Sequence, residues 1–322
     1  MRPDPPGPSR PEPAAPRAAQ ASAPPWRRST RRTGRPPTTT ATVVRAHDAP
    51  GPTLVLRVDR LPPGALALRG ELARLLRGLT GTPHAGINKI ALYGRTPHTL
   101  PYRFVQALPD GSFDFRAGCG HSLLACVVAD GRREPVTVRS VTTGDTVLCE
   151  PRGDAYTLSF LRAPTAPGTL PTGRPVDVLD GVPVSLVRYG NPYVFVDERH
   201  LPPKATYERL LALRAEAARL LGHPPTSALP KIAAFAEGAD GRLSVRALTV
   251  GGWHPRLALT GAAALAAAGA IGGTVVPAVH GPVRTPAGTV TVSAAPDRVR
   301  VHHKRAEVLE SLELPWRVHA TA

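Results

Sequence analysis

Cys119 lies between Gly118 and Gly120, directly before an apolar run that predicts a helix over residues 122–129. Flanking glycines let the backbone approach a ligand closely, and the first amides of a helix point toward whatever lies at its start. The same position favours a thiolate over a thiol. Cys119 is therefore a candidate acid or base, and a small buried core residue is the simpler alternative.

Lys89 is one of only four lysines, with Lys204, Lys231 and Lys304, among 40 Lys and Arg residues. A lysine retained in an arginine-rich chain can mark a position that needs an amine able to titrate, which a guanidinium cannot do; chance retention is the alternative. Lys89 lies in a predicted strand over residues 87–93. Its amine lies at a rim or points into a cleft, where burial and nearby cations lower the pKa toward that of a useful base.

Other chemistry-bearing residues are fewer. His254 precedes an Ala-rich run and either binds an anion or lies satisfied in the turn, and the cluster at residues 302–305 (His-His-Lys-Arg) is either ligand-facing or solvated. Cys126 and Cys149 lie among apolar residues, so we interpret both as core. The three cysteines form neither a disulfide framework nor a metal spacing. Spacings for a Ser-His-Asp triad, a phosphate loop or a Cys-x-x-Cys pair are also missing.

The composition is that of a folded protein with a basic tail. The chain has 322 residues, a formal net charge of +16, 42% hydrophobic and 20% charged residues, which excludes wholesale disorder. Residues 1–41 hold many Pro and Arg residues without apolar periodicity. They predict a disordered, solvated tail, which we favour over a nucleic-acid-binding arm. A basic chain suits a small anionic substrate.

No segment is typical of a secreted or membrane protein. The N-terminus has no apolar core after its basic residues. Residues 257–279 are uncharged and long enough to span a bilayer, but they are mostly Ala and Gly and include a Gly pair and a Pro. They predict a buried helix, a turn and a strand. With free cysteines, this favours a cytoplasmic protein, with no membrane partner.

The periodicity predicts an α/β protein of two similar domains, over residues 42–165 and 166–322, after the tail at 1–41. Strands are expected at 41–45, 53–58, 87–93, 102–107, 136–141, 146–150, 156–161, 184–187, 193–196, 231–237, 243–248, 274–277 and 289–294. Helices are expected at 70–78, 122–129, 207–221, 259–270 and 304–312, and the last of these can return to the first domain. Residues 88–93 resemble residues 191–196, which suggests that the halves are copies.

Several ordered motifs resemble the PrpF family of isomerases. They are Asn88-Lys89-Ile90-Ala91, the strand Tyr102–Gln106, Gly118-Cys119-Gly120-His121, Asn191-Pro192, Pro230-Lys231-Ile232, and the turn from Gly252 to Gly261. The resemblance covers residues 53–315. It implies the diaminopimelate-epimerase-like fold, in which two α/β domains each wrap a mixed sheet round a central helix and the active site lies between them.

The resemblance also implies a cofactor-free isomerase that moves a proton on an unsaturated di- or tricarboxylate, by cis–trans change or double-bond migration. Lys89 and Cys119 match the family's acid/base pair, without a decision between the two roles. Substrate contacts carry over to Asn88, Gly120, His121, Ser122, Asn191, His254, Thr260 and Gly261. A metal is not expected, nucleic acid is not favoured as a partner, and a homodimer stays open.

The sequence departs from the family where the substrate is held. Residues 45–53 replace the Arg-Gly-Gly-Thr-Ser-Lys-Gly segment, and Asn88, Gly118 and His121 replace Ser, Asn and Asn. These changes favour a divergent member with a specialised biosynthetic substrate. A binding or accessory protein that has lost the chemistry is the alternative. Two-thiol racemisation is disfavoured because no second Cys lies near Thr260.

Overall fold

The computed structural model describes residues 38–62, 64–224, 227–249 and 252–315, and these contain four α-helices and 18 strands. The helices are α1 (Ala65–Gly78), α2 (Gly120–Asp130), α3 (Thr206–Leu220) and α4 (Leu259–Gly269). The strands of the first half are β1 (Thr38–Ala46), β2 (Thr53–Arg57), β3 (Lys89–Tyr93), β4 (Thr99–Ala107), β5 (Phe113–Asp114), β6 (Val136–Ser140), β7 (Thr146–Arg152) and β8 (Ala155–Phe160). Those of the second half are β9 (Asp177–Leu179), β10 (Val182–Tyr189), β11 (Asn191–Asp197), β12 (Lys231–Glu237), β13 (Leu243–Thr249), β14 (Gly252–Trp253), β15 (Gly281–Thr285), β16 (Gly288–Ala295), β17 (Arg298–Lys304) and β18 (Ala306–Pro315).

The strand pairings repeat. In the first half β1–β2 is antiparallel, β2–β3 parallel, β3–β4 antiparallel, β4–β6 parallel, and β6–β7 and β7–β8 are antiparallel. The series β10, β11, β12, β13, β15, β16 and β17 has the same sequence of directions. Along the chain, one helix connects the two strands of each parallel pair. By this order α1 corresponds to α3, and α2 corresponds to α4.

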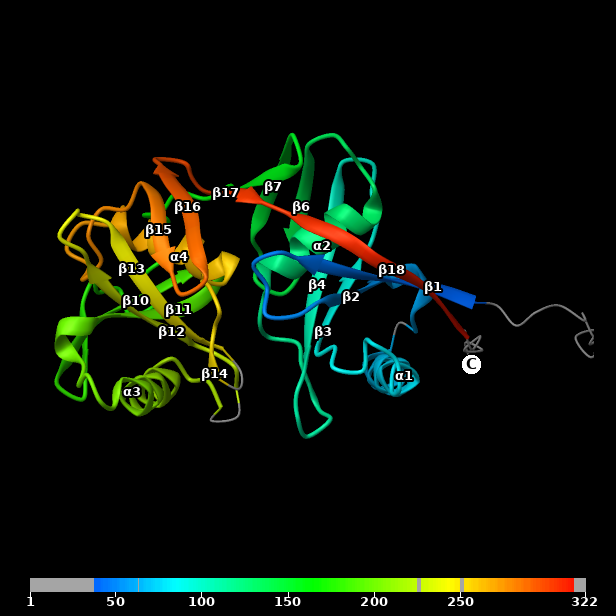
Figure 1. The fold of residues 1–322 in the computed structure, drawn as a ribbon, viewed down its shortest axis with the longest axis horizontal. Coiled ribbons are helices and arrows are strands. Elements are labelled where there is room, and N and C mark those ends of the chain that lie inside the picture. Colours follow the sequence, from blue (N-terminus) through cyan, green and yellow to red (C-terminus); the bar gives the residue numbers. More distant parts are fainter. Residues whose placement is uncertain (1–37, 63, 225–226, 250–251, 316–322) are drawn as a thin grey trace, which may run out of the picture. The chain divides into compact units, whose positions relative to one another are not determined.

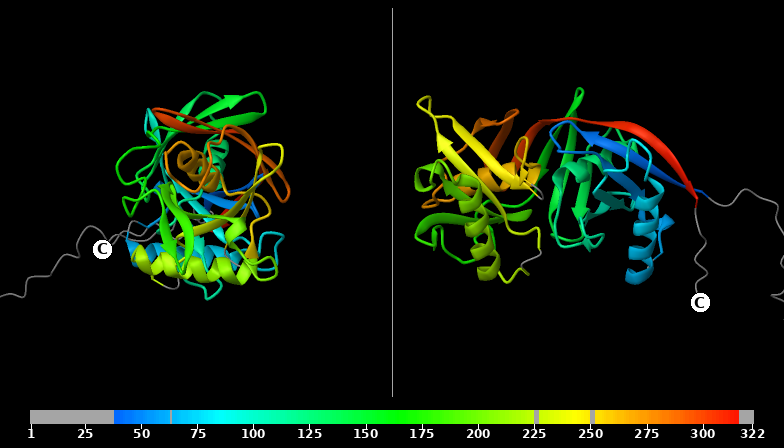
Figure 2. Two further views of the ribbon diagram at one scale, coloured as in Figure 1. Left: turned by 90° about the vertical axis from the view of Figure 1, so that its left-hand side faces the viewer. Right: turned by 60° about the horizontal axis from the view of Figure 1, so that its bottom comes forward.

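Each half surrounds one central helix. Helix α2 packs against β1, β2, β3, β4 and β18, and α4 packs against β10, β11, β16 and β17. Figures 1 and 2 show α2 and α4 among the strands, whereas α1 and α3 lie outside them. The largest apolar core includes residues of both central helices, and two smaller cores lie under α1 and α3. The expectation of mixed sheets wrapped round central helices is confirmed; the domain limits near residue 165 stay a prediction.

The helix predicted over residues 304–312 is wrong. These residues end β17 and form most of β18, which pairs antiparallel with β1, as Figure 1 shows. Glutamates spaced three residues apart imitate a helical face, but β1 supplies the backbone hydrogen bonds from the other end of the chain. The same pairing takes residues 38–41 into β1, so the predicted tail is too long there; residues 1–37 lie outside the described residues.

Two further predictions are corrected. The repeat aligned β3 with β11, but the pairings make β2 the counterpart of β11 and β3 the counterpart of β12. Similar apolar strands cannot be told apart without their neighbours. Residues 274–277 form no strand, because the Thr274 hydroxyl donates to the carbonyl of Ala268 at 2.9 Å and closes the end of α4.

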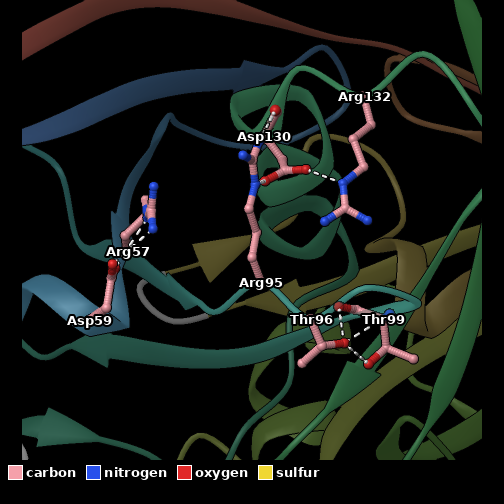
Figure 3. A network of polar contacts seen from close by, with 7 residues as sticks. All are labelled: Arg57, Asp59, Arg95, Thr96, Thr99, Asp130 and Arg132. Atoms are coloured by element: carbon pink, nitrogen blue, oxygen red, sulfur yellow. Dashed lines mark hydrogen bonds and ion pairs between the residues drawn. The ribbon is translucent and has the colours of Figure 1, made fainter.

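Helix α2 is fixed at its far end by charge. The Asp130 carboxylate is buried at the C-terminus of α2, where a negative charge opposes the helix dipole. Arg95 pairs with it and also donates to the Asp130 carbonyl at 2.8 Å, and Arg132 lies 2.6 Å from its other oxygen (Figure 3). The two guanidiniums offset the burial of the carboxylate and hold α2 against the end of β3.

At their near ends the two central helices meet. A Cβ built on Gly120, the first residue of α2, would lie 2.5 Å from Cδ2 and 2.8 Å from Cβ of Leu259, the first residue of α4. The absent side chain of Gly120 therefore lets the two helix starts approach each other. No helix among the described residues is long and apolar enough to cross a membrane.

We expect Gly120→Ala to lower the free energy of unfolding by about 1–3 kcal/mol, because the Cβ of Leu259 is fixed to the backbone and cannot move aside. Denaturant unfolding measures this loss. Gly78→Ala is the matched control, since Gly78 ends α1 and has open space around it. A Gly120→Ala protein as stable as the wild type would contradict this packing.

Candidate active site

The turn that opens α2 positions the candidate thiol. Cys119 immediately precedes the helix in extended conformation, with φ −143° and ψ 108°. Its carbonyl accepts hydrogen bonds from the amide of Leu123 at 2.9 Å and from the hydroxyl of Tyr102, a buried residue of β4, at 2.8 Å. The backbone of the turn is thus fixed from the helix and from the sheet, and the thiol is partly exposed at its tip.

A cavity of about 60 Å³ lies at this turn and is lined by both halves of the chain. The first half contributes Pro50, Lys89, Phe104, Gln106, Ala117, Gly118, Cys119, Gly120 and His121. The second half contributes Asn191, Tyr193, Ala228, Lys231, Thr249, His254, Ala258, Leu259 and Thr260. The starts of α2 and α4 therefore face the same small space, and both can present backbone amides to an anion.

Among the predicted site residues, this lining includes Lys89, Cys119, Gly120, His121, Asn191, His254 and Thr260. Asn88, Ser122 and Gly261 lie elsewhere. Asn88 is exposed, and the Ser122 hydroxyl is buried against that of Thr53, 3.0 Å away. Gly261 serves packing, because a Cβ there would lie 2.7 Å from the hydroxyl oxygen of Tyr193.

Lys89 is the first residue of β3 and is 7% exposed. Its amine donates a hydrogen bond to the carbonyl of Gly51 at 2.8 Å. Burial lowers the pKa of Lys89; a negative charge on Cys119 opposes this shift, and Arg45 adds to it. Lys89 and Cys119 line the same cavity.

Lys231 is the site residue that sequence analysis missed. It is the first residue of β12, the counterpart of β3, so the repeat places it in the second half as Lys89 is placed in the first. Burial and Arg214 lower the pKa of Lys231 to about 8, while Cys119 opposes the shift. Its retention as one of four lysines and its place in the Pro230-Lys231-Ile232 motif were the available signals, but the misaligned repeat hid its relation to Lys89.

Asn191 holds the Cys119 turn from the opposite half. Its side-chain oxygen accepts from the amide of Gly118 at 2.7 Å, and its side-chain nitrogen donates to the carbonyl of Gly118 at 2.8 Å. The same nitrogen lies 3.4 Å from the hydroxyl oxygen of Thr260 at the start of α4. The side-chain amide of Asn191 is hydrogen-bonded within the protein, so Asn191 positions the turn that carries Cys119.

Two histidines complete the lining. The rings of His121 and His254 are stacked with centroids 6.3 Å apart. Burial lowers the pKa of His121 well below its usual value, and Lys304, His254 in its protonated form and Lys89 lower it further. Burial likewise lowers the pKa of His254 to about 4. Both rings are therefore neutral near pH 7.

The neutral rings keep hydrogen-bonding capacity. Nδ1 of His254 accepts from the amide of Arg256 at 3.1 Å, which leaves the proton on Nε2. Nε2 of His121 is buried without a hydrogen-bond partner among the described residues. The cavity thus has two amines, two neutral imidazoles and a thiol, and its lining includes no Asp or Glu. Such a set suits an anionic ligand.

The loop between β1 and β2 aligns the Lys89 amine. Asp48 in this loop lies 2.6 Å from the amine of Lys304 and 3.0 Å from a guanidinium nitrogen of Arg256. Three residues further along the chain, the carbonyl of Gly51 accepts the hydrogen bond from the Lys89 amine. The segment at residues 45–53, where the sequence departs from the motifs it resembles, thus contacts the lysine through Gly51.

The basic cluster at residues 302–305 is not part of the lining. With Asp48 and Arg256 it borders a separate polar cavity of about 280 Å³. Lys304 is buried there, and Nε2 of His302 lies 2.8 Å from the hydroxyl oxygen of Ser293. Cys126 and Cys149 are fully buried, which confirms their core role, and burial raises the pKa of both thiols.

Comparison with solved structures places this architecture in a known fold. A methylitaconate-delta-isomerase superposes with a TM-score of 0.62 over 87% of this chain and 95% of its own, at 19% identity. A hydroxyproline epimerase from Agrobacterium vitis, with bound trans-4-hydroxy-L-proline, gives 0.54 over 86% and 92% at 17% identity. A probable proline racemase from Agrobacterium radiobacter K84, with bound carbonate, gives 0.54 over 88% and 94% at 17% identity.

These similarities establish the diaminopimelate-epimerase-like fold for this chain, as the sequence motifs implied. No protein-family model matches the sequence. A search of curated proteins also finds no significant match. The low identities show the fold alone.

We expect the affinity for succinate, an unreactive dicarboxylate, to fall about tenfold as the pH rises from 7 to 9. Lys231 is an ammonium below its pKa of about 8 and a neutral amine above it, so one attractive charge is lost. Isothermal titration measures the affinity. Lys231→Met should bind weakly at pH 7 and show a smaller fall, because the Lys89 amine remains. An unchanged wild-type affinity across this range, or an equal fall in Lys231→Met, would contradict the assignment.

Proposed function

We propose that the chain is a cofactor-independent isomerase that shifts a proton on an unsaturated di- or tricarboxylate. The observation that carries the proposal is that Cys119 lines one cavity together with a lysine from each half and with the first residues of α2 and α4. The sequence resemblance and the methylitaconate-delta-isomerase neighbour support the same class of substrate.

The carboxylates are bound by charge and by amides. The Lys231 ammonium and the first amides of α2 and α4 face the cavity, and no carboxylate of its lining opposes a negative ligand. The neutral rings of His121 and His254 add hydrogen-bond donors that do not depend on a positive charge. The protein therefore binds the carboxylate oxygens of the substrate, and the carbon chain of the substrate lies next to the Cys119 thiol.

The proton shift needs one base and one acid, and Lys89 and Cys119 supply them. The base takes a proton from the carbon next to the double bond. The electrons of that C–H bond form a new double bond, and those of the old one move onto the carboxylate as a dienolate. The acid returns a proton at the far carbon, or at the original carbon after rotation, so no atom is gained or lost.

The dienolate is the costly species. Donors fixed at the place where its charge develops stabilise it, and losing one typically costs about 3 kcal/mol. The amides of α2 and α4 are fixed in this way by the contact between Gly120 and Leu259 and by Asn191. The Lys231 ammonium adds charge on the opposite side.

A two-thiol racemase is disfavoured by the same geometry. In the second half, the residue directly before α4 is Ala258, which is the counterpart of Cys119. A methyl group cannot transfer a proton, so only one side of the substrate faces a thiol. A single thiol with a lysine fits a shift between two carbons better than inversion at one.

We expect wild-type protein in deuterated water to incorporate label into a methylitaconate-type acid, and Lys89→Met and Cys119→Ala each to reduce the rate at least about a hundredfold. Proton NMR of the acid measures label uptake and double-bond position together. Lys204→Met is the matched control, because Lys204 is exposed and does not line this cavity. Its rate should equal that of the wild type.

Label uptake that survives both substitutions would overturn the roles of Lys89 and Cys119. A wild-type protein that binds such acids but never exchanges their protons would instead be the binding protein that the altered substrate segment allows.

A further inference from the structure

A second, larger hollow lies beside the candidate active site. This outer groove has a volume of about 270 Å³, and Asn191 belongs to its lining and to that of the Cys119 cavity. A small gap of about 20 Å³ adjoins both: it shares Cys119 and Thr260 with the cavity, and Thr143 and Gly190 with the groove. A substituent that crosses this gap would join a ligand head at Cys119 to the groove.

The outer groove is basic, with charges from both halves of the chain. Arg116 precedes the Cys119 turn, Arg188 lies on β10, and His223 follows α3; the groove lining contains no Asp or Glu. Arg116 already pairs with Asp114 at 3.1 Å. Arg188 forms no ion pair within the described part of the chain, and it is the exposed position of a strand whose other residues are buried or half-buried.

Arg116, Arg188 and His223 line the same groove. Burial lowers the pKa of His223, and the cations Arg116 and Arg188 lower it further. A rigid strand position, an unpaired guanidinium and a neutral imidazole together resemble a built receptor for an oxyanion. The gap differs: Asp145 belongs to its lining, so the part of a ligand that crosses it has to be uncharged.

We propose that the outer groove binds a carboxylate at the end of an apolar arm of the substrate. The substrates are then alkenyl dicarboxylates extended by a carbon chain with a terminal carboxylate, and Arg188 determines this specificity. The inference rests on the proposed function, since the head of the ligand has to occupy the Cys119 cavity.

The test uses binding, which does not depend on proton transfer. Two saturated acids are compared by isothermal titration at pH 7: succinate carrying a carboxypropyl arm, and succinate carrying a butyl arm of the same length. We expect wild-type protein to bind the carboxypropyl acid about fivefold more tightly, as for a partly exposed ion pair. Arg188→Met should abolish this preference. Arg139→Met, which removes an exposed arginine of β6 outside both hollows, should keep it.

Equal affinity of the wild type for the two acids, no binding of either, or a preference that persists in Arg188→Met would overturn the proposal. Failure of the isomerase itself is distinguishable, because it shows as missing label uptake while the binding preference can still be measured. A preference lost in Arg139→Met as well would mean that net charge, and not the groove, selects the carboxypropyl acid.

Discussion

The structure depends on the contact between the starts of its two central helices. Gly120 leaves room for Leu259, and the amide of Asn191 fixes both backbone groups of Gly118. Each helix is enclosed by its own set of strands. The cavity at Cys119, to which both helices present their first amides, is closed only by the two halves together. Two halves with the same strand pairings thereby form one site, to which each half contributes different side chains.

The two sides differ in chemistry more than in backbone. Each half starts a corresponding strand with a lysine, Lys89 or Lys231, but only the first half places a thiol before its central helix. Partly burying two amines without a carboxylate in the lining is unfavourable for the empty protein. A bound dicarboxylate reverses that cost, so the same arrangement that weakens the free fold strengthens the complex.

The sequence alone could predict the features that depend on neighbouring residues in the chain. The Cys119 turn, the helix after it, and most strands follow from periodicity and glycine placement. What failed was decided by distant partners: residues 304–312 form a strand because β1 pairs with them, and the counterpart of β3 is known only from the parallel pair that contains it. The site followed the same division. Lys89 was recognised as a site residue from its motif, whereas the correspondence of Lys231 to Lys89 is known only from the strand pairings.

The most direct test is ¹⁵N NMR of the lysine amines, since the chain has only four lysines and single substitutions can assign each signal. Succinate is added stepwise to the protein. The account predicts that the signals of Lys89 and Lys231 shift together with one saturation curve, while that of the exposed Lys204 stays in place. Shifts confined to one of the two, or different saturation curves for them, would contradict a single anion-binding cavity shared by both halves.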